Sequence, residues 1–109
     1  MDTTQLLKGV LDVAVLAVVD DDDAYGYDIV RRLRETGMSD VGDASVYGTL
    51  RRLFTNGLLT SYMVPSEEGP ARKYYGITPT GRHQLKRSTE TWRDFVTAMD
   101  RLLTSEETR

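Results

Sequence analysis

The feature that most constrains the fold is a long helical pattern near the end of the chain. Apolar residues recur at helical spacing from Pro79 to Leu103, and Thr78 followed by Pro79 is typical of a helix start. A helix over these 25 residues would be about 37 Å long at about 1.5 Å per residue. The rest of the chain can build only a small domain, so we expect the far end of this helix to need a partner.

The apolar positions of this last helix form one stripe with a spacing close to that of a coiled-coil seam. Its members are Leu85, Trp92, Phe95, Val96, Met99, Leu102 and Leu103. The stripe can fold back onto Leu6, Leu7 and Val10 of its own chain, or it can pack against a second copy. We favour the second arrangement and expect a homodimer. Trp92 is then a packing residue, or it lines a pocket for a flat hydrophobic ligand between subunits.

The residues before this helix show three helical patterns followed by two strand patterns. The predicted helices are Thr3 to Val19, Ala24 to Thr36 and Ala44 to Asn56, and the predicted strands are Leu58 to Val64 and Lys73 to Ile77, joined by a loop at 66–71. This order predicts a mainly α fold with a small β-hairpin: a winged helix-turn-helix with a long C-terminal dimerisation helix. We divide it into residues 1–78, the winged helix-turn-helix, and residues 79–109, the last helix and tail, in one compact unit.

Local signals set the expected ends of these elements. Gly37 and Gly57 are expected to end the second and third helices, and Tyr27 is expected to face the core. The run Asp20–Asp23 is interpreted as a turn and helix cap, because four consecutive acids cannot all converge on one metal ion. Asp43 is expected to cap the third helix. Because the run Asp20–Asp23 is interpreted as a turn and helix cap, we predict no metal site.

Charge is divided unevenly along the chain, although its total is only −3. Residues 1–43 carry ten acids and four bases, a net −6, and residues 88–109 carry −2. Residues 44–87 are the reverse, with seven bases and two acids, a net +5. Clustered positive charge is typical of a nucleic-acid site. The alternative, which charge alone leaves open, is a solvated basic face.

The third predicted helix presents small and basic residues opposite its apolar face. Val46, Leu50 and Leu53 define the buried side, and the residues expected on the opposite face and its flanks are Ala44, Ser45, Tyr47, Gly48, Arg51 and Arg52. Arginines pair with phosphates or with guanine edges in the major groove. An exposed glycine in mid-helix costs about 1 kcal/mol relative to alanine, so a close partner is the simplest reason for Gly48. We favour DNA contact over a merely solvated face.

The hairpin carries the consecutive residues Arg72, Lys73, Tyr74 and Tyr75. Arginine and lysine neutralise phosphates, and tyrosine hydroxyls donate hydrogen bonds to them. Successive side chains of a strand point to opposite faces, so we expect one tyrosine to face DNA and the other to pack inward.

Four blocks of the sequence, LLKGVLDVAVLAVV, YGYDIVRRL, SVYGTLRRLFTNGLL and GPARKYYGITPTGRHQL, resemble the PadR family of bacterial transcriptional regulators in order and spacing. The family consists of dimeric winged-helix repressors. The resemblance implies DNA contacts at Ser45, Tyr47, Thr49, Arg52, Arg72, Lys73, Tyr74 and Tyr75. It also implies a dimer interface built from the first and last helices, which adds Leu6, Leu7 and Val10 to the residues of the stripe. In some short members of the family, planar hydrophobic ligands bind beside a tryptophan at a position similar to Trp92.

This sequence departs from the family pattern at two positions of the third helix. Many members have proline where Gly48 stands and an acid where Phe54 stands. Because the sequence ends soon after the long helix, it is similar to the short subgroup of the family, which has no further helical domain.

The sequence also disfavours other functions. It contains no cysteine and a single histidine, His83, with no obvious partners for acid–base chemistry, so we expect no enzyme activity and no cofactor. The most apolar run, Val13 to Val19, is too short to cross a membrane, and we expect a cytoplasmic protein. We predict a sequence-specific DNA-binding regulator, a homodimeric repressor relieved by a small hydrophobic effector. The alternative is a winged-helix protein-interaction module that does not bind DNA.

Overall fold

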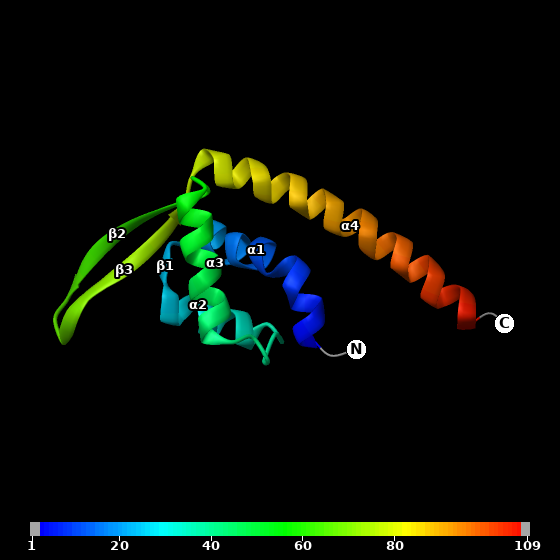
Figure 1. The fold of residues 1–109 in the computed structure, drawn as a ribbon, viewed down its shortest axis with the longest axis horizontal. Helices are drawn as coiled ribbons and strands as arrows, with labels where there is room; N and C mark the ends of the chain where they lie inside the picture. Colours follow the sequence, from blue (N-terminus) through cyan, green and yellow to red (C-terminus); the bar gives the residue numbers. More distant parts are fainter. Residues whose placement is uncertain (1–2, 108–109) are drawn as a thin grey trace.

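A computed structural model describes residues 3–107 of the chain and the side chains of residues 5–104. Its elements, in chain order, are α1 (Thr3–Asp21), β1 (Ala24–Tyr25), α2 (Gly26–Glu35), α3 (Asp43–Thr55), β2 (Leu59–Ser66), β3 (Gly69–Ile77) and α4 (Pro79–Glu107). The first three helices and the sheet form a small body, which we call the winged body (residues 3–77), and α4 extends away from it (Figure 1). The predicted fold, a winged helix with a long last helix, is confirmed.

The core of the winged body lies between α1, α2 and α3. Its most deeply buried side chains come from all three helices and include Leu16, Ile29, Leu33, Leu50 and Leu53. The predicted buried face of α3 is confirmed, since Val46, Leu50 and Leu53 all belong to this cluster. Full burial of each large aliphatic side chain contributes about 1.5–3 kcal/mol to folding. The core thus fixes the opposite face of α3 toward solvent.

The sheet has three antiparallel strands in the order β1-β3-β2, one more than predicted. The additional strand contains only Ala24 and Tyr25, which pair with Tyr75 and Tyr74 of β3. The prediction that Ala24 begins a helix is therefore wrong. Two residues are too few to show a strand period, and the pairing depends on β3, which lies far along the chain.

The hairpin of β2 and β3 is longer than the sequence indicated. β2 continues to Ser66 and β3 begins at Gly69, so the expected loop at 66–71 shrinks to the turn at 67–68. The register is regular from the pair Leu59 and Ile77 to the pair Val64 and Arg72, with an irregularity between Val64 and Ser66. The result is a long ribbon that projects from the body beside α3 (Figure 1).

Helix ends agree with the glycine signals and disagree with the acidic ones. Gly37 and Gly57, with φ of 115° and 78°, follow α2 and α3 as predicted. The residues at the N-cap positions of α2 and α3 are Tyr25 and Gly42, neither with a side-chain capping bond. The caps expected from the Asp run and from Asp43 are therefore wrong. Asp43 is the first residue of α3 and accepts a bond from Arg34 at 2.9 Å instead.

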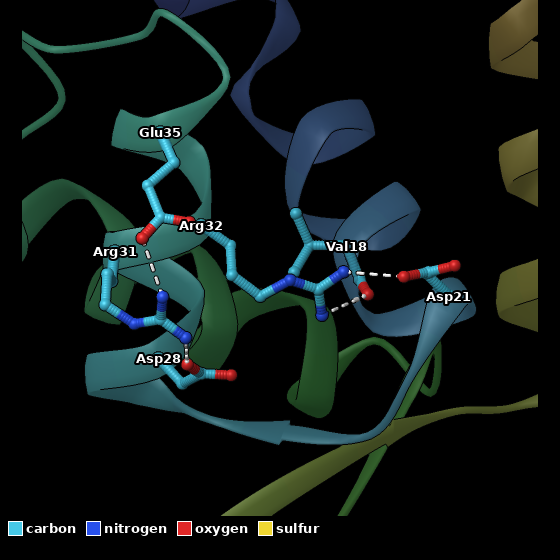
Figure 2. Close-up of polar contacts among 6 residues, drawn as sticks. All are labelled: Val18, Asp21, Asp28, Arg31, Arg32 and Glu35. Atoms are coloured by element: carbon cyan, nitrogen blue, oxygen red, sulfur yellow. Dashed lines mark hydrogen bonds and ion pairs between the residues drawn. The ribbon is translucent and has the colours of Figure 1, made fainter.

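The acidic run Asp20–Asp23 contains residues that pair with arginines of other helices. Asp20 and Asp21 extend α1, where acids oppose the helix dipole. Arg32 of α2 compensates for this, because its guanidinium donates to the Val18 carbonyl at 3.3 Å and to the Asp21 carboxylate at 2.7 Å (Figure 2). Asp20 pairs with Arg82 of α4 at 3.3 Å. The run therefore joins α1 to both α2 and α4, and within the described residues no group of side chains suited to a metal ion occurs.

The long helix α4 begins where predicted and runs further. The Gly81 N–H donates to the Thr78 hydroxyl at 3.0 Å, which confirms Thr78 as the cap. Only the first part of α4 packs on the body, with Leu85 against the core. The molecule is accordingly elongated, with principal extents of 61 × 27 × 19 Å. Within the described residues, no helix is both long and apolar enough to cross a membrane.

Candidate nucleic-acid interface

The outward face of α3 has the composition expected of a recognition helix. Ala44, Ser45 and Arg51 are exposed, and Gly48 is partly exposed between them. A Cβ at Gly48 would meet no other described atom within 4 Å, so no contact within the described chain requires glycine there. Thr49 lies on the other side and is only 4% exposed. It therefore does not belong to this face, in contrast to what the family resemblance implied.

Tyr47 is held at the edge of this face by a close contact with α2. A Cβ added to Gly26, the first residue of α2, would lie 2.2 Å from Cε1 of Tyr47, so the ring occupies the space that any side chain at Gly26 would need. Sequence reasoning did not single out Gly26, because the contact joins residues of different helices. The ring of Tyr47 is exposed at its outer side.

Tyr27 also lies at the start of α2, and its position corrects the sequence reading. It is 65% exposed rather than buried in the core. Tyr27 and Tyr47 line the same surface hollow between α2 and α3. The hollow between α2 and α3 is therefore bordered by two accessible tyrosines.

The two neighbouring arginines of α3 have different surroundings. Arg52 forms an ion pair with Asp12 of α1. Arg51 has no acidic partner among the described residues. It lies toward β3: burial raises the pKa of Tyr75, and the positive charge of Arg51 acts against this rise. Arg51 is thus the arginine that α3 presents with its charge uncompensated.

The arginines of α2 are all engaged within the chain. Arg31 contacts both Asp28 and Glu35, one turn away on either side, as Figure 2 shows beside the Arg32 contacts. Arg34 donates to the Val41 carbonyl at 3.0 Å and to Asp43. Arg31 is thus paired within α2, Arg32 with α1, and Arg34 with the turn before α3. The uncompensated arginine of the helix-turn-helix is Arg51 of α3.

Arg72 and Lys73 of the wing point to opposite faces of β3. Lys73 faces α3, with its Nζ 5.8 Å from the centres of both the Phe54 and Tyr75 rings. Arg72 lies on the other face, with its guanidinium carbon 4.7 Å from the centre of the Tyr25 ring. Lys73 and Arg51 therefore border the space between α3 and the wing, whereas Arg72 belongs to the outer surface of the sheet.

A row of tyrosines covers that outer surface. Tyr74 lies between Tyr25 at 5.5 Å and Tyr62 at 6.0 Å, measured between ring centres, and Tyr27 continues the row at 6.2 Å from Tyr25. The Tyr62 hydroxyl donates to Asp23 at 2.5 Å, a bond that raises the Tyr62 pKa. Tyr75 is buried on the opposite face, so the expected opposition of Tyr74 and Tyr75 is confirmed. The row itself depends on strand register and could not be read from the sequence.

The positive centre of the sequence is split in space. Arg51, Arg52, Arg72 and Lys73 lie on α3 and the wing, but the remaining basic residues of this segment, Arg82, Lys86 and Arg87, lie on α4. The start of α4 is next to the C-terminal end of α3 (Figure 1). The positive segment 44–87 is therefore divided between the candidate interface, which holds the basic residues of α3 and the wing, and the start of α4.

A second hollow separates α1 from α4. This cavity of about 640 Å³ has a mostly apolar lining that includes Leu6, Val10, Trp92 and Phe95. The Trp92 and Phe95 rings are 6.4 Å apart between centres. Leu7, which we also expected at a dimer interface, is buried in the core of the winged body. It points away from this cavity because Leu6 and Leu7 fall on different sides of α1.

Comparison with known proteins identifies relatives that share this fold. The model of the transcriptional regulator PadR-like family matches residues 15–87. A PadR-like transcriptional regulator from Bacillus cereus is 34% identical, with a TM-score of 0.82 over 91% of this chain and 96% of that chain. A Streptococcus transcriptional regulator is 33% identical, with a TM-score of 0.80 over 90% and 96%. Bacillus subtilis PadR, solved in complex with operator DNA, is 23% identical and shares the fold, with a TM-score of 0.68 over 73% and 46%.

Proposed function

The chain belongs to the PadR-like family of transcriptional regulators, and from this premise we propose that it is a homodimeric repressor that binds operator DNA. The observation that carries the proposal is the outward face of α3, where Arg51 and the open surface at Gly48 are accessible, together with Lys73 of the wing, which lies against Phe54 of the same helix. The operator complex of the Bacillus subtilis relative supports the same use of the shared fold.

The proposed complex places the outward face of α3 in the major groove. Small residues at Ala44, Ser45 and Gly48 allow the helix to approach base edges, and Arg51 can reach a guanine edge or a phosphate. Lys73 then contacts the phosphates that border the groove on the wing side. Tyr27 of α2 and Tyr47 of α3 are both exposed, and in this complex their hydroxyl groups can donate hydrogen bonds to the DNA backbone.

A binding assay with DNA from upstream of the protein's own gene tests this proposal. We expect Arg51→Ala to weaken operator binding by about 1–3 kcal/mol and to relax sequence discrimination, because it removes a base contact. Lys73→Ala should weaken all duplexes alike, and affinity should fall steeply with salt. Lys86→Ala, an exposed lysine of α4, is the matched control. Absence of binding to any genomic fragment at low salt would contradict the proposal and favour a protein-interaction module.

The homodimer in this proposal is supported by the apolar stripe of α4. Phe95 is 58% and Leu102 66% exposed, although both are large apolar residues on one face of a helix. Packing against a second copy would cover them and would place two α3 helices on half-sites about 34 Å apart, one helical turn of DNA. Sedimentation analysis at several concentrations tests this, and a monomer at tens of micromolar would contradict it.

The effector in this proposal would occupy the cavity between α1 and α4. Its volume of about 640 Å³ is within the range of small-molecule sites, about 300–1,000 Å³. The rings of Trp92 and Phe95 favour a flat hydrophobic compound. Because Trp92 is the single tryptophan, its fluorescence reports binding directly. Operator affinity that stays constant at saturating ligand would contradict the regulatory role, even if the fluorescence is quenched.

A further inference from the structure

The ion pair between Arg52 of α3 and Asp12 of α1 lies at the edge of the candidate interface. Arg52 Nη2 donates to Asp12 Oδ1, and both side chains remain about half exposed, at 54% and 48%. The pair borders a groove of about 580 Å³ between α1 and α3, which Ser45 and Gly48 also line. Arg52, paired with Asp12, therefore lies in the groove that adjoins the small residues of the recognition face.

This pair is weak enough to exchange. An ion pair between exposed side chains changes an equilibrium by no more than about fivefold. A DNA phosphate offers Arg52 a competing bidentate partner, and the groove gives the guanidinium room to move. The pair is also not needed to hold α1 on α3, because Leu11, Val15 and Leu50 already join the two helices in the core.

We propose that Asp12 is a specificity-determining residue, which withholds Arg52 from DNA until the correct operator is bound. This inference rests on the proposed DNA-binding function. Non-specific binding is almost entirely electrostatic. The loss of one available cation and the presence of one acid therefore lower non-specific affinity, and no base contacts offset the loss. In the operator complex, base contacts hold α3 in place, and Arg52 can then exchange Asp12 for a phosphate. Asp12 therefore raises the ratio of specific to non-specific affinity.

Fluorescence anisotropy with an operator duplex and a scrambled duplex of equal length tests this inference. For Asp12→Asn we expect binding to the scrambled duplex to tighten about three- to tenfold per dimer, with a smaller gain at the operator, so that specificity falls. Asp12→Glu, which keeps the charge, should resemble the wild type. In the Arg52→Ala background, Asp12→Asn should lose most of its effect, because the cation that it releases is absent.

Asp40→Asn is the matched control, since Asp40 lines the same groove but has no ion-pair partner among the described residues. Its effect on non-specific binding should be smaller and equal with or without Arg52. An Asp12→Asn variant that unfolds at the wild-type urea midpoint and binds the scrambled duplex no better than wild type would overturn this inference but not the proposed function. An equal effect of Asp12→Asn in both backgrounds would also overturn it. A wild-type protein that binds neither duplex would overturn the proposed function as well.

Discussion

The winged body and the outer half of α4, residues 92–104, both carry apolar stripes on helices, but only the body covers its stripes. Leu16, Ile29 and Leu50 are almost completely inaccessible, whereas Phe95, Leu102 and Leu103 are each more than half exposed. The two regions differ in the elements that pack against their stripes. α1, α2 and α3 pack on one another, while α4 meets the body only near its start. A helical stripe therefore identifies the apolar side of a helix but not the molecule that covers it.

The largest expected difference between the two regions is in folding stability. Leu50→Ala removes a fully buried side chain from the core, and we expect it to lower the free energy of unfolding by about 2–5 kcal/mol. Leu102→Ala removes the same atoms from the exposed stripe, and at nanomolar concentration it should change stability little. Urea unfolding of both variants measures this. Equal losses at low concentration would show that α4 is covered by its own chain.

The second prediction separates association from folding. Phe95→Asp places a charge in the exposed stripe, and we expect it to abolish dimer formation while the helical circular dichroism persists. Operator affinity should then fall more than tenfold, since two linked recognition helices bind with a high effective concentration. Thr97→Asp introduces the same charge on the opposite side of α4 and is the control. Sedimentation distinguishes the two variants, and a dimeric Phe95→Asp protein would place the interface elsewhere.

The third prediction tests the close contact between Gly26 of α2 and Tyr47 of α3. The Cβ of Gly26→Ala would overlap the Tyr47 ring, at 2.2 Å from Cε1, in the wild-type geometry. The overlapped atoms are the outer end of an exposed side chain that can swing aside, so we expect a loss of about 0.5–1.5 kcal/mol in the free energy of unfolding, typical of a strained rotamer. Removal of the ring in a Gly26→Ala/Tyr47→Ala double variant should recover part of the loss. Additive losses would mean that the two residues do not meet.

The fourth prediction uses a glycine in open space as the counterpart of Gly26. Gly48→Ala should stabilise the free protein by up to about 1 kcal/mol, because alanine favours a helix and a Cβ here meets no described atom within 4 Å. The same methyl group should weaken operator binding, if α3 approaches the duplex closely. Thermal unfolding and binding measured on one preparation test both effects. Greater stability with unchanged affinity would remove Gly48 from the proposed interface.

The smallest effect concerns the wing at alkaline pH. The Tyr62 hydroxyl donates to Asp23, and this bond raises the Tyr62 pKa above its ordinary value of 10.0. The native state therefore keeps a proton that the unfolded chain releases, so this contribution to stability is complete below pH 10 and is lost as pH rises through the native pKa. Tyr62→Phe should reduce the fall in stability between pH 9 and 11. Tyr75, whose pKa burial also raises, would contribute to the fall that remains.

Local patterns predicted the parts of this molecule that depend on neighbours in the chain. The buried face of α3, the glycines after α2 and α3, the cap at Thr78 and the opposition of Tyr74 and Tyr75 all follow from helix and strand periods. Strand β1 and the contact of Gly26 with Tyr47 depend on segments that meet only in the folded chain. The pair of Asp12 with Arg52 is of the same kind, since it joins residues 40 positions apart. Such contacts leave no periodic signal in the sequence.

The exposed stripe of α4 has a consequence for how the regulator responds to its own abundance. In the proposed dimer, the DNA-binding species forms from two chains, so at low abundance its concentration rises with the square of the chain concentration. A twofold change in synthesis then produces up to a fourfold change in the active form. The stripe would thus make the onset of repression steeper than a monomer with the same recognition helix allows, without any cooperativity between operators.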